Sequence, residues 1–346
     1  MSKGFPPPEV PEEELSAIPA PPVLVIAGPT GVGKSLLAMA VAARAPGEII
    51  VADSMQVYRG MDVGTGKPSA EERRAIPHHL LDICDPAQVF SAFEFARRAH
   101  EAVHAIRARD RLPVLVGGTG LYLRAFLKGQ LSGGAGDPAI RARLRADAAV
   151  RGSAALHDRL RQVDPDSAAS IRPGDLFRIV RALELWESTR QPASTIRSGL
   201  WDPPRVAVSA FVVLTRERQE LFRLVDLRAA RMWEDGLVAE VRGLLQAGYA
   251  ADLRPLQSLG YRQALAVIKG EMGEAEALEE MQRATRKYAK RQLTWFRREP
   301  AAEWITVQGA DWVEPVATAL VSRLQRAAGT AGATVGGPTL KAGDRP

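Results

Sequence analysis

The sequence is poor in the features that secreted and membrane proteins depend on. It contains one cysteine, Cys84, in 346 residues, which excludes a disulfide framework and, without a Cys-x-x-Cys pair, argues against a structural zinc site. No apolar run approaches the roughly 20 residues that cross a bilayer, and no basic-then-apolar signal segment begins the sequence. We therefore expect a cytoplasmic protein without a membrane partner.

The composition is that of a chain with a substantial core. Hydrophobic residues make up 46% of the sequence, which is enough for one large or two ordinary domains. The net charge of +6 is compatible with a polyanionic partner and equally with an arginine-rich bias. Residues 1–20 are rich in proline and glutamate, and residues 327–346 are rich in glycine, alanine and threonine. We predict two disordered tails.

The most informative stretch is residues 23–35, a buried strand followed by a phosphate-binding loop. Five apolar residues at 23–27 predict a parallel strand, the next eight fit the P-loop pattern G-x-x-x-x-G-K-S, and a helix is predicted at about 36–44. Backbone amides, the helix N-terminus and Lys34 would hold a di- or triphosphate, and the Ser35 hydroxyl would bind a bridging Mg²⁺. The predicted loop consists of Gly28, Pro29, Thr30, Gly31, Val32, Gly33, Lys34 and Ser35.

Two further strands of the predicted parallel sheet end in different residues. The strand at 48–53 ends in Asp53, and the carboxyl ends of parallel strands line the ligand crevice. The strand at 112–116 runs into Gly117-Gly118-Thr119, whereas P-loop NTPases usually place an aspartate there to support Mg²⁺ and the attacking water. A phosphate cradle beside one strand-end carboxylate indicates group transfer rather than ATP hydrolysis.

The remaining pattern is mostly helical. Ser91 and Glu94 predict a capping box for a helix that runs to about Arg109. Further helices are predicted at about 217–247 and 261–269, and strands at 206–214 and 304–307. The residues expected to be buried in the helix after Ser91 are Phe93, Ala96, Ala99, Val103 and Ile106.

A helical segment rich in arginine interrupts this pattern. The glycine-rich residues 129–136 precede a helical stretch that continues to about Arg197, and the strand at 206–214 then returns to the sheet. We therefore predict an α/β core with a parallel sheet flanked by helices, formed by residues 21–128 and 204–308, and an inserted all-helical subdomain at 129–203. A run of charges is more often a solvated helix face than a binding surface.

Residues 282–298 predict a helix with charge of one sign. On a helical wheel the basic side chains fall on one side, and the aromatic ones fall outside it. Solvated helices normally mix signs to gain i,i+4 pairs, so this face favours contact with a phosphate backbone. The face consists of Arg283, Arg286, Lys287, Lys290, Arg291, Thr294, Arg297 and Arg298.

Taken together, these blocks resemble the bacterial tRNA dimethylallyltransferases, also called tRNA isopentenyltransferases or IPP transferases. The resemblance covers about residues 23–308 and is specific because the blocks share their order and spacing. It is carried by the P-loop, Asp53-Ser-Met-Gln-Val-Tyr58, Gly60-Met-Asp-Val-Gly-Thr65, Pro77-His-His-Leu-Leu-Asp82, Gly117-Gly-Thr-Gly-Leu-Tyr122, Gly260-Tyr-Arg262 and Lys290-Arg-Gln-Leu-Thr-Trp295.

The resemblance implies a reaction and its participants. A dimethylallyl group would pass from dimethylallyl diphosphate to the N6 amine of the adenine 3′ to the tRNA anticodon, with the P-loop holding diphosphate and Mg²⁺ as cofactor. The partners implied are the tRNA anticodon stem-loop and dimethylallyl diphosphate, and we expect a monomer without an obligate protein partner. The base must leave its stack to react.

The resemblance also implies residue roles. Asp53 matches the general base, and Lys34 and Arg228 would stabilise the leaving diphosphate. Phe177 departs from the glutamine commonly found at its position, which puts one base contact in doubt. The implied tRNA-binding residues are Asp53, Ser54, Met55, Gln56, Thr119, Arg141, Arg178, Arg181, Arg262, Lys290 and Arg291.

Two alternatives remain open from the sequence. An adenylate dimethylallyltransferase would prenylate free AMP, ADP or ATP, although it has less use for the arginine-dense insertion. A small-molecule P-loop kinase or an NTP-driven RNA-binding module would use ATP, and the Gly117-Gly118 strand end argues against it. Turnover of tRNA, free nucleotides or ATP distinguishes the three.

Overall fold

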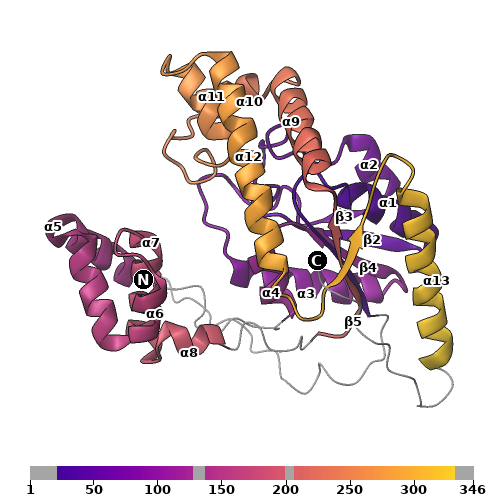
Figure 1. The fold of residues 1–346 in the computed structure, drawn as a ribbon, viewed down its shortest axis with the longest axis horizontal. Helices are drawn as coiled ribbons and strands as arrows, with labels where there is room; N and C mark the ends of the chain where they lie inside the picture. Colours follow the sequence, from indigo (N-terminus) through magenta and orange to yellow (C-terminus); the bar gives the residue numbers. More distant parts are fainter. Residues whose placement is uncertain (1–21, 128–136, 199–205, 332–346) are drawn as a thin grey trace, which may run out of the picture.

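A six-stranded parallel sheet forms the centre of the protein. The computed structural model describes residues 22–127, 137–198 and 206–331 (Figure 1), and within them the strand order is β3-β2-β4-β1-β5-β6. The strands are β1 Val23–Ala27, β2 Gly47–Ala52, β3 His78–His79, β4 Leu112–Gly117, β5 Val208–Thr215 and β6 Glu303–Thr306. The predicted P-loop α/β core is confirmed.

The middle strands owe their position to uninterrupted apolar runs. Every residue of β1 is buried, and β1 pairs on one side with β4 and on the other with β5. A strand that is buried on both faces has an almost continuous apolar sequence, because none of its side chains faces solvent. The predicted strand boundaries differ from the observed ones by only one or two residues, and the short edge strand β3 was not predicted.

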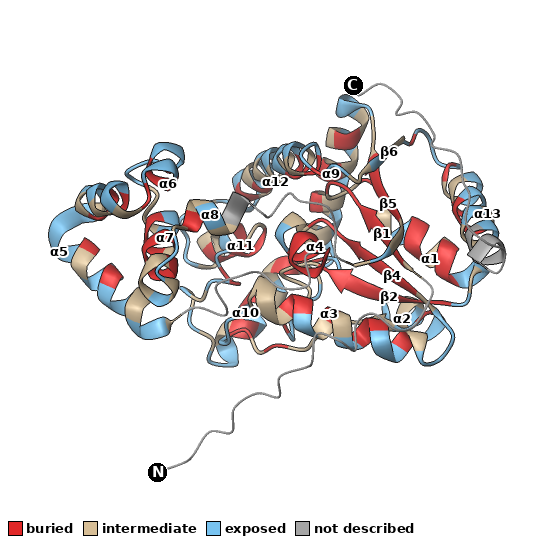
Figure 2. Cartoon of the chain, turned by 90° about the horizontal axis from the view of Figure 1, so that it is seen from below, coloured by how far each residue is buried: buried red, intermediate tan, exposed pale blue. Residues whose placement is uncertain are grey.

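Helices cover both faces of the sheet (Figure 2). Helices α1, Lys34–Arg44, and α13, Val313–Ala331, pack together on one face. Helices α3, Ala92–Arg107, and α4, Gly120–Leu127, cover the other, and the short α2, Ala70–Ala75, lies at the edge near β3. The domain therefore has the three layers of a P-loop NTPase-like fold.

Helix α3 differs from the prediction in two details. Phe95 is fully buried and stacks on Tyr122, whereas Phe93 is only partly buried, so the expectation for Phe93 was wrong. Ser91 accepts a hydrogen bond from the Glu94 amide, but the Glu94 carboxylate binds arginines of its own helix instead of closing the capping box. The other four residues predicted to be buried, Ala96, Ala99, Val103 and Ile106, are buried.

The helices after β5 gather at the carboxyl ends of the strands. The single helix predicted at 217–247 is broken at Gly236, whose φ of +100° ends one helix and starts the next. This conformation strains other residues much more than glycine. The helices of this layer are α9 Arg218–Glu234, α10 Leu237–Gln246, α11 Tyr261–Ile268 and α12 Glu274–Phe296.

Four helices between β4 and β5 form a separate cluster, seen at the left of Figure 1. They are α5 Pro138–Val163, α6 Pro165–Ser170, α7 Leu176–Thr189 and α8 Ala193–Ser198. Their buried apolar side chains, such as Leu160 and Leu183, form a hydrophobic cluster distinct from those of the sheet. Gly152 kinks α5 with a φ of 81°. The predicted glycine-rich segment 129–136 lies outside the described residues.

The C-terminal boundary of the core was placed too early. Helix α13 continues to Ala331, so the tail predicted from residue 327 starts inside a helix and its remainder, 332–346, lies outside the described residues. The predicted tail 1–20 lies outside them as well. Trp312, Ala317 and Leu320 are buried against α1 and the sheet. Within the described residues, no helix has the length and apolar character of a membrane span.

Candidate active site

A cavity of about 450 Å³ opens where the strands end and the P-loop begins. The P-loop supplies Thr30, Lys34 and Ser35 to its wall, and the segment after β2 supplies Asp53. Parallel strands meet at this edge because their carboxyl ends all point the same way. Other lining residues are Ser54, Met55, Gln56, Gly118, Arg228, Tyr288, Arg291 and Gln292.

The P-loop has the backbone that its glycines allow. Gly33 is the N-cap of α1 with a φ of +103°, and a Cβ there would lie 2.6 Å from the Cζ2 atom of Trp312. The Arg216 guanidinium carbon lies 5.5 Å from the centroid of the Trp312 ring, and the guanidinium donates a hydrogen bond to the Val32 carbonyl. The start of α13 therefore supports the back of the loop, while the Lys34 Nζ donates to the Pro29 carbonyl at 2.7 Å.

Lys34 and Arg228 share the cavity with the Asp53 carboxylate. Burial and the neighbouring Arg228 lower the pKa of Lys34 to about 7, while Asp53 acts in the opposite direction. Burial also lowers the pKa of Arg228, which donates to the Thr65 carbonyl at 3.2 Å. Desolvated cations of this kind gain most from an anionic ligand.

The Asp53 carboxylate is held by its own chain. Its Oδ1 atom accepts hydrogen bonds from the Met55 amide at 2.8 Å and the Gln56 amide at 3.3 Å. The Thr119 hydroxyl accepts from the Ser54 amide at 3.1 Å. The turn after β4 thus braces the residues that follow Asp53, and this keeps the carboxylate at the cavity wall.

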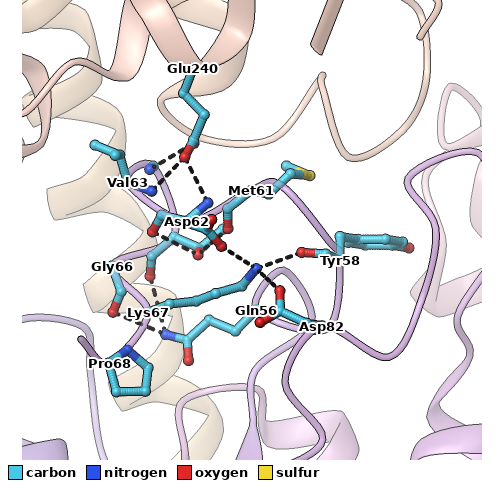
Figure 3. Close-up of polar contacts among 12 residues, drawn as sticks. Gln56, Tyr58, Met61, Asp62, Val63, Gly66, Lys67, Pro68, Asp82 and Glu240 are labelled. Carbon is cyan, nitrogen blue, oxygen red and sulfur yellow. Dashed lines mark hydrogen bonds and ion pairs between the residues drawn. The ribbon is translucent and has the colours of Figure 1, made fainter. Parts of the chain in front are cut away.

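The loop at 61–68 forms a second wall, drawn in Figure 3. Gln56 donates its side-chain amide to the Thr65 and Gly66 carbonyls at 3.1 and 3.4 Å. The Lys67 ammonium donates to the Tyr58 carbonyl and to two carboxylates, one of them Asp82 at 2.5 Å. Gln56 therefore supports this wall, which presents the Thr65 carbonyl to Arg228.

Glu240 secures the same loop from helix α10. Its carboxylate accepts from three consecutive amides, those of Asp62 at 2.8 Å, Val63 at 2.7 Å and Gly64 at 3.2 Å. The Tyr261 hydroxyl donates to it at 2.6 Å. Charge-assisted bonds to backbone amides are strong, so α10 fixes the wall of the cavity.

Helix α12 forms a further wall of the cavity. Tyr288 and Arg291 line it, with the Arg291 guanidinium 5.7 Å from the Tyr288 ring centroid. Burial raises the pKa of the Tyr288 hydroxyl, and the Asp53 carboxylate adds to this effect. Gln292 lies on the same side of the helix and bonds to Thr30 and Gly118.

The family model described as IPP transferase matches residues 56–299. Over 286 residues the chain is 49% identical to the tRNA dimethylallyltransferase of Myxococcus xanthus, covering 82% of this chain and 92% of that one. The chain belongs to the IPP transferase family.

Other members of the IPP transferase family agree in sequence and structure. The tRNA dimethylallyltransferase of Geobacter sulfurreducens is 46% identical over 285 residues, covering 82% of this chain and 91% of that one. The full-length tRNA isopentenylpyrophosphate transferase of Bacillus halodurans superposes with a TM-score of 0.65 at 35% identity, covering 90% of this chain and 99% of that one. A eukaryotic dimethylallyltransferase acting on tRNA gives a TM-score of 0.70 at 25% identity, covering 90% and 78%.

Several residues that the IPP transferase resemblance assigned to tRNA lie away from the cavity. In the insertion, Arg141 and Arg181 both pair with the buried Glu184, at 2.9 and 2.8 Å, and Arg178 pairs with Asp175. These arginines are partly neutralised by acids of their own subdomain. Arg262 at the start of α11 lies 3.9 Å from Glu280 on α12. Neither group lines the cavity.

The cationic face predicted on α12 is largely exposed. Arg283, Lys287 and Lys290 are exposed, and the Lys290 ammonium lies 5.3 Å from the Phe222 ring centroid. Arg286 departs from the prediction, because both oxygens of Asp226 on α9 bind its guanidinium at 2.6 and 2.7 Å. The charges that remain exposed on α12 continue from the rim of the cavity.

Sequence reasoning missed the side chains that α12 turns toward the cavity. Tyr288 fell outside the charged face and was left without a role, and Gln292 carried no signal beyond its place in Lys290-Arg-Gln-Leu-Thr-Trp295. The glycines of the turn after β4 are the sequence signal for a close neighbour. In the structure this neighbour is helix α12, because a Cβ at Gly120 would lie 2.2 Å from Trp295.

Oxygen ligands for a metal are sparse at the site. Within the described residues, no group of three or more histidine, cysteine, aspartate or glutamate side chains is arranged to hold a metal ion. The Ser35 hydroxyl and the Asp53 carboxylate line the same cavity.

His79 does not line this cavity. Its Nε2 atom lies 2.6 Å from the Glu48 carboxylate, which is a structural contact at the start of β2.

Proposed function

We propose that the protein transfers the dimethylallyl group of dimethylallyl diphosphate to the N6 amine of the adenine 3′ to the tRNA anticodon. The observation that carries this proposal is one cavity with a P-loop on one wall and the Asp53 carboxylate on another. In the reaction a C–N bond forms, the C–O bond of the donor breaks, and diphosphate leaves with the electron pair. The proton from the amine passes to Asp53.

The P-loop and two cations would hold the leaving group. Lys34 is the residue whose charge state responds to an anion, because its pKa of about 7 rises when diphosphate binds. Arg228 faces the same space from α9 and is held by the Thr65 carbonyl. Fixed positive charge on a departing diphosphate lowers the barrier to bond cleavage.

Magnesium fits the cavity as a diphosphate-bound ion. Mg²⁺ takes one or two protein oxygens and completes its shell with phosphate oxygens and water, and the Ser35 hydroxyl supplies an oxygen at the first turn of α1. When bound, the ion would neutralise charge on the diphosphate. Lys34 and Arg228 would do so from the protein side.

Asp53 suits the role of general base. Two backbone amides orient one of its oxygens, which leaves the carboxylate with acceptor capacity for the substrate amine. An adenine amine is a weak nucleophile, so a carboxylate within hydrogen-bond reach assists it. The adenine must be extruded from its stack to enter the cavity. Ser54, Met55 and Gln56 line its path.

The tRNA would lie across the exposed charges. Arg291 lines the cavity on α12 and Lys290 is exposed next to it, while the insertion adds the exposed Arg178 and the half-buried Arg141 and Arg181. Contacts of this kind position the RNA through its phosphates. Under this proposal the protein is a monomer that acts in the cytoplasm, where its tRNA substrate is.

Transfer of label tests the proposal directly. Unmodified tRNA is incubated with labelled dimethylallyl diphosphate in parallel with AMP, ADP and ATP, and nucleosides are identified by mass spectrometry. The expected result is label in one adenosine next to the anticodon. Label only in free nucleotides would assign an adenylate dimethylallyltransferase, and γ-phosphate transfer from ATP would assign a kinase. Lys34→Ala is the control, since it leaves the RNA surface unchanged.

A further inference from the structure

Gln292 joins helix α12 to the two loops that face each other across the cavity. Its Oε1 atom accepts a hydrogen bond from the Thr30 amide of the P-loop at 2.9 Å, and its Nε2 atom donates to the Gly118 carbonyl at 2.9 Å. The residue is 6% exposed. A buried amide bonded at both ends holds its partners at a set separation.

The side-chain amide satisfies both loops because it carries an acceptor and a donor. The Thr30 amide requires an acceptor and the Gly118 carbonyl requires a donor, so the two partners also fix the orientation of the glutamine. Space is limited as well, because a Cβ at Gly118 would lie 2.2 Å from the Gln292 Nε2 atom. The close approach of helix and turn depends on this glycine.

Each of the two loops leads to a different half of the site. Thr30 belongs to the P-loop and lies four residues before Lys34 in the sequence. Gly118 precedes Thr119, whose hydroxyl accepts from the Ser54 amide beside Asp53. Gln292 therefore lies between the loop that carries Lys34 and the turn that braces the Asp53 carboxylate.

We propose that Gln292 is a positioning residue that sets the distance between the P-loop and Asp53. The inference rests on the proposed transfer reaction, in which the P-loop holds the dimethylallyl diphosphate and Asp53 binds the amine of the adenine. Small errors in the separation of two reactants reduce rates strongly, by up to about 10²-fold for 1 Å. We expect the exposed Lys290 and Arg291 to keep their positions when Gln292 is substituted.

Gln292→Leu is the first variant. We expect the KM for dimethylallyl diphosphate to rise and kcat to fall, each by about tenfold. The tRNA dissociation constant should stay within about twofold of the parent, because the exposed face of α12 is unchanged. Steady-state kinetics, tRNA binding and thermal unfolding are measured on the same preparations.

Gln292→Glu should give a pH dependence of kcat/KM that a purely structural role of Gln292 would not produce. The carboxylate form accepts from Thr30 but repels the Gly118 carbonyl, whereas the protonated form has an O–H that donates to it. Burial raises the pKa of such a group. The kcat/KM of this variant relative to the parent should therefore rise as the pH falls from about 8 to about 6.

Gln282→Leu is the matched control on the same helix. Gln282 donates to the Asp226 carbonyl at 3.2 Å and lies outside the cavity. It should retain the KM and kcat of the parent even where its melting temperature falls.

The outcomes separate this inference from the proposed function. If the parent and Gln282→Leu do not modify tRNA, the proposed function fails. If they do, and Gln292→Leu has parental kinetics or Gln292→Glu shows no recovery at low pH, the positioning role is rejected. Failure of both Gln292 variants to fold would also reject it, since it would make the residue structural.

Discussion

The P-loop lysine and the arginines of the helical insertion have opposite surroundings. In the insertion, Arg141 and Arg181 pair with Glu184, while Arg143 and Arg159 pair with Glu187. In the cavity, the Lys34 ammonium binds a backbone carbonyl and its pKa is lowered. Paired arginines stabilise a fold, whereas an uncompensated, desolvated lysine attracts an anion. A high density of arginine therefore marks the insertion, but a single lysine marks the site.

The largest effect should come from the carboxylate of the cavity. We expect Asp53→Asn to lower kcat by about 10²-fold or more, because an amide cannot take the proton of the amine. The tRNA dissociation constant should be nearly unchanged, since asparagine keeps the acceptor atom that binds the Met55 and Gln56 amides. Single-turnover assays and filter binding measure the two. Parental turnover would remove Asp53 as the base.

Substitution of Glu184, the buried acid of the insertion, should weaken tRNA binding and leave donor binding unchanged. Glu184 is fully buried and also accepts from the Asp137 amide at 2.7 Å. We expect Glu184→Ala to destabilise the four-helix subdomain by roughly 2 kcal/mol and to weaken tRNA binding by about tenfold. The Kd for dimethylallyl diphosphate should not change. A loss of donor affinity would show that the two regions are coupled.

The exposed cations of α12 should act through phosphate contacts. We expect Lys290→Ala with Arg291→Ala to weaken tRNA binding several-fold and to reduce the slope of log Kd against log salt by about 1.5 to 2. Arg97→Ala with Arg98→Ala on α3 makes the same change of charge and is the control, since both pair with Glu94. An unchanged slope would mean that this face of α12 meets only solvent.

Near pH 7 the smallest effect is on donor binding, which should depend on pH. Lys34 has a pKa of about 7 in the free protein, and bound diphosphate favours its charged form. The complex therefore holds more protons than the free protein above pH 7, so the Kd for the donor should rise with pH by up to about tenfold per unit. Titrations at three pH values measure this, with Lys34→Ala as the variant that lacks this dependence.

The sequence predicted the features that depend on neighbouring residues and missed those that depend on contacts between distant elements. Strand β1, the P-loop and the start of α1 were predictable because adjacent residues specify them. Phe93 was predicted to be buried where Phe95 is, because the period of a helix does not say which neighbour it will meet. Helix α13 was missed since its apolar face matters only once α1 is present to receive it.

The charge assignments show the same limit. The helical wheel for residues 282–298 identified an exposed face, yet it could not find Asp226, which binds Arg286 from another helix. The partners of Arg141, Arg143 and Arg159 on α5 likewise come from α7. Pairing of charges between two helices depends on how the helices pack, and the spacing within one helix does not contain it.

The sequence by itself determined the chemistry of the pieces: a glycine loop able to wrap a phosphate, a lysine at its end, and an aspartate at the end of a buried strand. Each of these depends on backbone preferences over a few residues. Only the tertiary structure decided that α12 closes the cavity, with Tyr288 on its wall and Gln292 between the loops. These contacts join residues more than 170 positions apart, and close packing rather than local preference selects them.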